Sequence, residues 1–181
     1  PTPAPDAGSQ PMRATLLAAA ILPCLLSGPV RASGVSDATV TAVTDCIRAA
    51  AALHQVPPGV IAVLLAVEGG SIGRTSGNTN GTVDIGPMQI NEIHLPAIAP
   101  RWGTSVAAAR SALLNNFCAN VEAGAWILRT ALDSAGGDFW EGVGRYHSRT
   151  EVYKGRYLRQ VLTQVLRLRD RASGTGSRGV P

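Results

Sequence analysis

The 181-residue chain has a length typical of one domain, and its 45% apolar content is enough to build a core. Aromatic residues make up only 4%, and the formal net charge of +4 would suit an anionic partner such as nucleic acid, a membrane surface or a cell-wall polymer. No Lys/Arg run is dense and no DNA- or RNA-binding motif occurs, which argues against nucleic acid.

The N-terminal segment indicates export. A single positive charge precedes an apolar stretch at 16–26, and small residues stand one and three positions before a cut after Ala32. We therefore predict a signal peptide at 12–32 and a periplasmic protein. The stretch is too short for a permanent membrane anchor, although it would also suit a buried core helix. Residues 1–11 contain much Pro and no Met, and we expect them to be a disordered segment upstream of the true start.

The first predicted elements are two helices followed by a glycine-rich segment. Asp37 can cap a helix with helical apolar spacing that stops before Pro57. Pro58 suits the first position of a second helix, 58–68, which is apolar on nearly every face and is therefore expected to be central. Six glycines between positions 69 and 86 predict a loop or a small irregular hairpin.

The remainder of the chain is predicted to be helical. Helices are expected over 92–98, from a cap at Thr104, across 117–132, from a cap at Asp138 to Ser148, and over 151–170. We therefore expect an all-α domain over 36–169, followed by a disordered tail at 170–181.

Two cysteines, Cys46 and Cys118, remain once the signal peptide is removed. An even number in an exported domain predicts one disulfide, which would close a loop of about 70 residues and contribute roughly 4 kcal/mol. The alternative is a pair of buried free thiols. No metal site or cofactor is expected, because His54, His94 and His147 are isolated from each other and from the cysteines.

Glu68 is the first candidate for chemistry. It ends the most apolar helix of the chain, where apolar surroundings and the negative end of the helix dipole both disfavour a charged carboxylate. A glutamic acid that stays protonated near neutral pH can act as a general acid. The glycines that follow leave room for a ligand. The alternative is that Glu68 is an ordinary residue at a helix end whose side chain points into water.

The sequence around Glu68 resembles a known family. Glu68, the stretch "NTNGTVDIGPMQIN" at 78–91 and "YHS" at 146–148 are similar to the lysozyme-like superfamily, most closely to the lytic transglycosylase (SLT) domain of small stand-alone bacterial proteins. The similarity spans about 36–165. It implies a lysozyme-like helical domain with a glycine-rich loop or small hairpin beside the active site, and such proteins often carry a disulfide where the two cysteines lie.

The resemblance also implies an activity and a substrate. Lytic transglycosylases cleave the β-1,4 bond between N-acetylmuramic acid and N-acetylglucosamine in peptidoglycan glycan strands. Glu68 would protonate the glycosidic oxygen and then remove a proton from the C6 hydroxyl, which closes a 1,6-anhydro ring without water. Small relatives often serve secretion, conjugation or pilus machines, so components of such an apparatus are expected partners.

The resemblance implies a set of substrate-binding residues and leaves two departures. The implied set is Ser71, Met88, Gln89, Asn91 and Tyr146. Many relatives have Ser after the catalytic Glu, so any role of that serine is missing here or passes to Ser71. His147 stands where relatives have Asn, and it either replaces that Asn or is a surface or packing residue. Met88 is expected to pack beneath the site, and Gln89 either binds sugar or acts as scaffold.

Asp84 leaves a second mechanism open. Animal-type lysozymes place an Asp at this point, where it works as a second carboxylate in hydrolysis. Asp84 would then make the protein a hydrolytic muramidase, whereas an Asp84 that only braces the loop would favour the transglycosylase. A third alternative is a non-catalytic wall-binding scaffold of a secretion apparatus, in which Glu68 is incidental.

Overall fold

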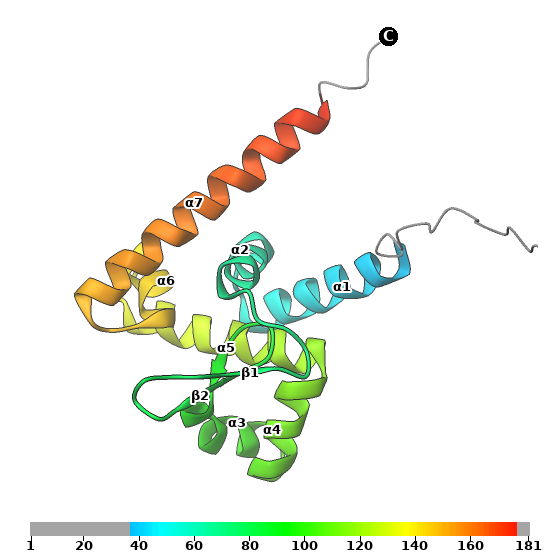
Figure 1. The fold of residues 1–181 in the computed structure, drawn as a ribbon, viewed down its shortest axis with the longest axis vertical. Coiled ribbons are helices and arrows are strands. Elements are labelled where there is room, and N and C mark those ends of the chain that lie inside the picture. The colour runs from blue at the N-terminus through cyan, green and yellow to red at the C-terminus, as the bar shows by residue number, and fades with distance from the viewer. Residues whose placement is uncertain (1–36, 177–181) are drawn as a thin grey trace, which may run out of the picture. The chain divides into compact units, whose positions relative to one another are not determined.

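The computed structural model describes residues 37–176 (Figure 1). This part contains seven α-helices and a small three-stranded sheet, and the predicted all-α, lysozyme-like class is confirmed. The segment predicted at 1–11, the signal peptide at 12–32 and the end of the tail from 177 lie outside the described residues.

The first two helices are bent sharply against each other. Helix α1 spans Asp37–His54 and α2 spans Pro58–Glu68, and the chain bends by 119° between them. Pro58 opens α2 as predicted, and α2 buries Ile61, Val63 and Leu64 in the core. No single helix within 37–176 is long and apolar enough to cross a membrane, although α1 and α2 counted together pass that test of length and composition.

The glycine-rich segment forms a hairpin with a third strand added. Strand β1 (Thr75–Gly77) pairs antiparallel with β2 (Val83–Ile85), which pairs antiparallel with β3 (Ile90–Asn91). In this register Asp84 lies opposite Asn91. The sheet therefore brings together two polar residues of the sequence motif.

Four helical segments follow the sheet. They are a 3-10 turn at Glu92–His94, α3 at Leu95–Arg101, α4 at Val106–Asn115 and α5 at Phe117–Ser134. The cap of α4 is Ser105, whose Oγ accepts from the Ala108 N–H at 3.2 Å, so the prediction of Thr104 was wrong by one residue. Both residue types cap well, and the actual start of the helix selects between them.

Helix α5 is the centre of the domain. Nine of its residues are buried, and it contacts α1, α4 and α6. Glu122 of α5 accepts from His54 Nε2 of α1 at 2.6 Å and from Trp102 Nε1 at 2.7 Å. This carboxylate therefore connects α1 and the end of α3 to the central helix.

The predicted disulfide is present. Cys46 of α1 and Cys118 in the first turn of α5 are bonded, with their Cα atoms 5.0 Å apart and 72 positions separating them in sequence. The bond links the same two helices that Glu122 joins further along.

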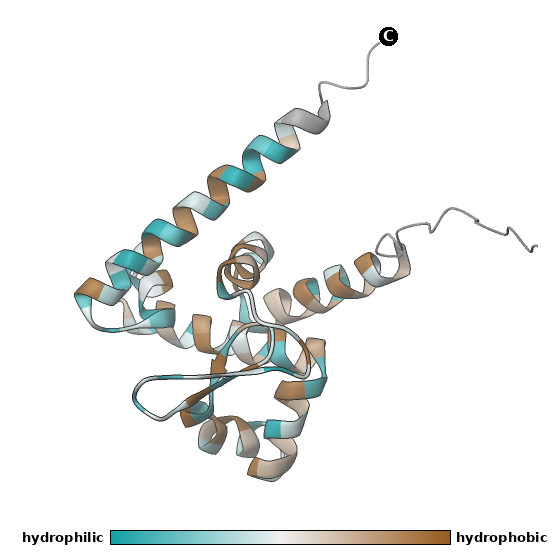
Figure 2. Ribbon diagram, in the orientation of Figure 1, coloured by the Kyte–Doolittle hydropathy of each residue, from teal (hydrophilic) through white to brown (hydrophobic). Residues whose placement is uncertain are grey.

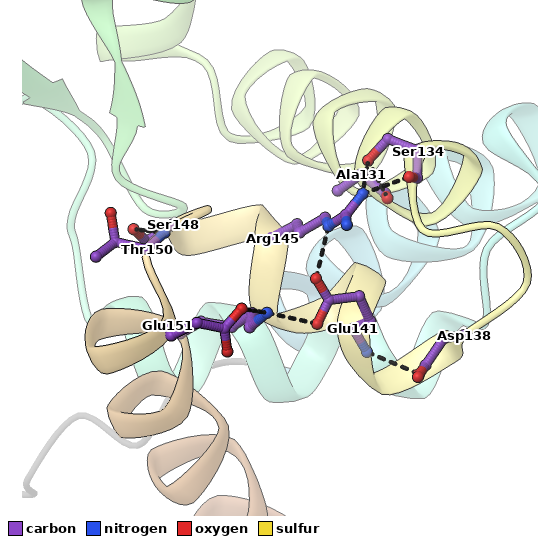
Figure 3. A network of polar contacts seen from close by, with 9 residues as sticks. Ala131, Ser134, Asp138, Glu141, Arg145, Ser148, Thr150 and Glu151 are labelled. Atoms are coloured by element: carbon purple, nitrogen blue, oxygen red, sulfur yellow. Dashed lines mark hydrogen bonds and ion pairs between the residues drawn. The ribbon is translucent and has the colours of Figure 1, made fainter.

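The last two helices are held together by an ion-pair network. Helix α6 spans Phe139–His147, starting at the predicted cap Asp138, and α7 spans Glu151–Gly176. Glu141 of α6 accepts from Arg145 Nε at 2.7 Å and from Lys154 Nζ of α7 at 2.6 Å (Figure 3). Lys154 is 7% exposed and also donates to Glu151 at 2.5 Å. The network fixes α6 against α7.

Helix α7 is longer than expected. The prediction ended it at Asp170, whereas the helix continues to Gly176. Polar composition suggested a disordered tail, but Arg and Ala are good helix formers, and Ser173 Oγ donates to the Arg169 carbonyl at 3.1 Å. Hydrophilic and hydrophobic segments alternate along α7, in contrast to the apolar α2 (Figure 2).

Candidate active site

Glu68 lines a cleft whose volume is about 310 Å³. It is the last residue of α2, and the helix ends directly after it because Gly69 adopts a left-handed conformation with φ of 63°. The Glu68 side chain is half-buried, and its Oε1 accepts a hydrogen bond from Tyr157 Oη of α7 at 2.6 Å. The carboxyl group is therefore held at a fixed position at the edge of the apolar core.

The electrostatic surroundings of Glu68 favour its protonated form. Burial is the main cause that raises its pKa to about 7, while the Tyr157 hydrogen bond lowers the pKa and the charge of Asp84 raises it. A substantial fraction of Glu68 is therefore protonated at neutral pH. A carboxylic acid in this state can donate a proton to a bound ligand.

Gly70 is needed for a different reason from Gly69, because a neighbouring loop lies too close for a side chain. A Cβ at position 70 would lie 2.1 Å from the Gly86 carbonyl oxygen and 2.5 Å from Gln89 Nε2. Only glycine allows the chain after α2 to pass this close to the loop that follows β2. The two adjacent glycines thus end the helix and bring the loop up to Glu68.

Asp84 and Asn91 form another part of the cleft lining. Asn91 Nδ2 donates to Asp84 Oδ1 at 2.7 Å and to Thr82 Oγ1 at 2.8 Å, and Asn91 Oδ1 accepts from the Ile93 N–H at 3.1 Å. The Asn91 amide is largely occupied by these internal bonds. It holds Asp84 in place and caps the following 3-10 turn.

The turn after β2 is held from below by a buried amide. Asn120 of α5 is 0% exposed, and its Nδ2 donates to the carbonyls of Ile85 and Leu113, each at 2.9 Å. Its Oδ1 accepts from the Met88 N–H at 2.8 Å. Asn120 thereby provides hydrogen-bond partners for backbone groups at the end of β2, in the turn after it and in α4, as buried polar groups require.

Gln89 adopts an unusual backbone conformation for a residue other than glycine. Its φ is 48°, and its Nε2 donates to the Gly86 carbonyl at 2.8 Å. This strained geometry is typical of functional loops, and it keeps the half-buried Gln89 side chain at the cleft.

Two tyrosines and a histidine from α6 and α7 complete the surroundings of the acid. Tyr146 Oη donates to the Met88 carbonyl at 3.1 Å, and its ring stacks on Tyr157 with centroids 6.4 Å apart. His147 stacks on Tyr157 at 4.6 Å. Burial raises the pKa of the Tyr146 hydroxyl well above its usual value, with additional contributions from the charges of Glu68 and Asp84, so it stays protonated.

Both histidines of the cleft favour the neutral form. Burial lowers the pKa of His94 and of His147, and the charge of Asp84 only partly offsets this effect. Within residues 37–176, no group of three or more His, Cys, Asp or Glu side chains could hold a metal ion. The polar groups that line the cleft are two carboxyl groups, four side-chain amides, one phenol hydroxyl and two imidazoles.

The structure brings most of the predicted site residues together. Glu68, Asp84, Gln89, Asn91, Tyr146 and His147 all line the cleft. Met88 is 0% exposed and packs against Gly124, so it supports the site from beneath and does not reach a ligand. Ser71 is exposed and does not line the cleft, which places it away from the predicted binding role.

Sequence reasoning missed several residues of the site. Tyr157 was included only as part of the helix predicted at 151–170, although a buried tyrosine hydroxyl usually needs a partner, which was the available signal. Asn78, Asn80 and His94 also line the cleft. The cleft continues into a second hollow of about 260 Å³ between α5 and α6, and the two share His94, Ile127, Tyr146 and His147. An elongated ligand fits such a groove better than a small compact one.

A comparison with known families agrees with this geometry. The family model described as "Transglycosylase SLT domain" matches residues 45–159, which is more than half of the chain. The matched span includes every cleft residue named above. No curated protein matches the chain significantly.

Proposed function

Because the chain belongs to the transglycosylase SLT domain family, which acts on peptidoglycan in the manner of lytic transglycosylases, we propose that Glu68 is its catalytic acid. The proposed reaction breaks the β-1,4 bond between N-acetylmuramic acid and N-acetylglucosamine. The observation that carries the proposal is a carboxyl group with a pKa of about 7 at the edge of an elongated cleft.

The proposed reaction needs one acid that later acts as a base. Protonated Glu68 donates its proton to the glycosidic oxygen as the bond from that oxygen to C1 breaks, and the substrate's acetamido group stabilises the cation. The C6 hydroxyl then attacks C1, and the Glu68 carboxylate takes the hydroxyl proton. One C–O bond breaks, one forms, the proton returns to Glu68, and no water is consumed. Acid–base help of this kind contributes roughly 10²- to 10⁴-fold.

Asp84 has the role of a brace and a fixed charge in this proposal. Its Oδ1 is engaged by Asn91, and its negative charge raises the pKa of Glu68, which favours the protonated acid. The hydrolytic mechanism remains an alternative because Asp84 lines the same cleft as Glu68. A carboxylate there would be able to act on the sugar if it faced the anomeric carbon.

The products distinguish the two mechanisms. Ring closure should give muropeptides with 1,6-anhydro ends, each one water lighter than the hydrolytic product, and Asp84→Asn should lower activity only modestly because the residue transfers no proton. Mass spectrometry of peptidoglycan digests from wild type and Asp84→Asn measures both. Mostly reducing-end products, together with an Asp84→Asn variant nearly as inactive as Glu68→Gln, would establish the hydrolytic muramidase instead.

The pH dependence should follow the protonation of Glu68. Because Glu68 must be protonated to act, its active form is complete well below pH 7 and is lost as the pH rises through about 7, so kcat/KM should fall toward tenfold per pH unit above that value. Tyr157→Phe removes a hydrogen bond that favours the carboxylate, so this falling limb should move to higher pH.

Tyr153→Phe is the matched control for that experiment, because Tyr153 lies on the same helix with its side chain exposed. Its profile should coincide with that of wild type. A limb that stays in place or moves to lower pH in Tyr157→Phe would contradict the proposed coupling between Tyr157 and Glu68.

The biological setting is also proposed. We infer export to the periplasm from the signal peptide predicted at 12–32, and local wall remodelling for a secretion, conjugation or pilus apparatus from the small size of the domain. The non-catalytic scaffold is disfavoured because a scaffold needs no carboxyl group with so raised a pKa. Zymography on purified peptidoglycan tests the enzyme against the scaffold directly.

A further inference from the structure

A second groove lies between α2 and α7, outside the cleft. It is open, has a volume of about 390 Å³, and is lined by Ala66 and Val67 of α2. From α7 it receives Arg156, Arg159, Gln160, Thr163, Gln164 and Arg167. The α7 residues recur at spacings of three and four, so they form one stripe that runs for about 17 Å along the helix.

The three arginines of this groove form no ion pair within the described residues, and Asp170, which lies three positions after Arg167, pairs with Arg169. Among the described residues no carboxylate forms an ion pair with Arg156, Arg159 or Arg167, whereas Lys154 of the same helix is paired with Glu141 and Glu151. Arg156 and Arg159 lie one helical turn apart and repel each other, and Arg167 adds a third positive charge further along the stripe. An anionic ligand in the groove would relieve that repulsion, and Arg is well suited to carboxylates and phosphates.

The other lining residues favour a peptide over a phosphate. Gln160 and Gln164 each carry a carbonyl acceptor as well as amide donors. Thr163 Oγ1 donates to the Arg159 carbonyl at 2.8 Å and can accept from a ligand. A phosphodiester or a lipid headgroup phosphate offers only acceptors, so the glutamine carbonyls would take no part in binding it. A peptide offers N–H donors and C=O acceptors together, and an acidic peptide adds the carboxylates that the arginines require.

The groove lies close to the cleft but on another side of α2. Successive side chains on an α-helix are about 100° apart, so Glu68 points about 150° away from the midpoint between Ala66 and Val67. A peptide that passes around α2 from the groove to the cleft therefore follows about 150° of a helix about 10 Å across, a path of roughly 13 Å. An extended peptide covers that distance with about three to four residues.

We propose that this groove binds the acidic stem peptide that the wall glycan carries while the glycan lies in the cleft. This inference rests on the proposed function, because it takes the ligand from the same substrate. Helix α7 then has two roles: Tyr157 contacts the acid, and the arginine stripe holds the peptide. The groove would add affinity for glycan strands that still bear their peptides.

The test compares two substrates and two triple variants. One variant is Arg156→Gln/Arg159→Gln/Arg167→Gln, and its control is Arg48→Gln/Arg110→Gln/Arg169→Gln, which removes the same charge outside the groove. The substrates are intact peptidoglycan and glycan strands freed of stem peptides by an amidase. On intact peptidoglycan we expect the groove variant to lose roughly tenfold in kcat/KM through KM, because three exposed charge pairs each add a modest factor.

On stripped glycan the groove variant should match wild type, and the control should match wild type on both substrates. If the groove variant loses kcat/KM equally on both substrates, or loses none on intact peptidoglycan, the groove does not bind the stem peptide. Either result would leave the proposed function unaffected. Wild type inactive on both substrates would instead refute the proposed function.

If wild type is inactive on both substrates, a binding measurement still tests whether the groove binds the stem peptide. Stem peptides released by the amidase are titrated into wild type and the groove variant by NMR, and only wild type should bind, more weakly as salt is added. Vesicles of anionic phospholipid and a phosphodiester wall polymer are titrated in parallel. Binding of either of these with no binding of the peptide would overturn the acidic-peptide ligand.

Discussion

Glu68→Gln should abolish glycan cleavage while leaving the fold intact. The substitution keeps the size of the side chain and removes the proton that the reaction needs, so the loss should be at least 100-fold, the lower end of what acid–base catalysis contributes. Zymography and muropeptide release measure activity, and thermal unfolding measures stability. Retention of more than a few per cent of wild-type activity would exclude Glu68 as the acid.

The stability of this variant has a predictable pH dependence. The folded-state pKa of Glu68 is raised, so the wild-type side chain favours folding most at low pH and loses that contribution as the pH rises through about 7. Gln does not ionise, so the variant should be at least as stable as wild type at pH 8. Asp133→Asn, which alters an exposed carboxylate paired with Arg129 on α5, is the control and should retain full activity.

Removing the disulfide should cost the most stability. The Cys46→Ser/Cys118→Ser variant frees a loop closed across 72 positions, which the chain-entropy model equates with about 4 kcal/mol of unfolding free energy. For a domain of this size the unfolding temperature should fall on the order of 10 °C. Denaturant titration of oxidised wild type and the variant measures the difference.

The same bond can be checked without substitution. Protein purified without reducing agent and then denatured should show no titratable thiol at Cys46 or Cys118. Two free sulfhydryl groups under those conditions would contradict the pairing. Cleavage activity of the double variant at low temperature should remain near that of wild type, because neither cysteine lines the cleft.

Local signals in the sequence were enough for the helices that frame the site. Pro58 and Gly69 mark the two ends of α2 by their backbone preferences alone, and the apolar character of 58–68 predicted its central place. Asp138 was likewise recognisable as a cap, because its carboxylate accepts from an N–H only three residues on. Features that depend on neighbouring residues were predictable.

Features that depend on distant partners were not. Gly70 is required by the Gly86 carbonyl, and Tyr157 bonds a carboxyl group 89 positions away. Periodicity predicted the helix that carries Tyr157 but contains no information about where its hydroxyl points. Asn120 was missed for the same reason, since its partners lie in the turn after β2 and in α4.

The hairpin beside the cleft is fastened at its two ends by separate sets of contacts. Asn120 of α5 holds its base, whereas its tip is closed by its own bonds, from the Asn78 N–H to the Thr82 carbonyl at 2.8 Å and from the Gly81 N–H to the Asn78 carbonyl at 3.0 Å. Thr82 connects the tip to the rest of the site, because its Oγ1 donates to Asn80 Oδ1 at 2.8 Å and accepts from Asn91 Nδ2 at 2.8 Å. Since Asn78 and Asn80 line the cleft, we expect exchanges at 78–81 to reshape its mouth, and those that keep the Thr82–Asn91 bond should leave Asp84 in place.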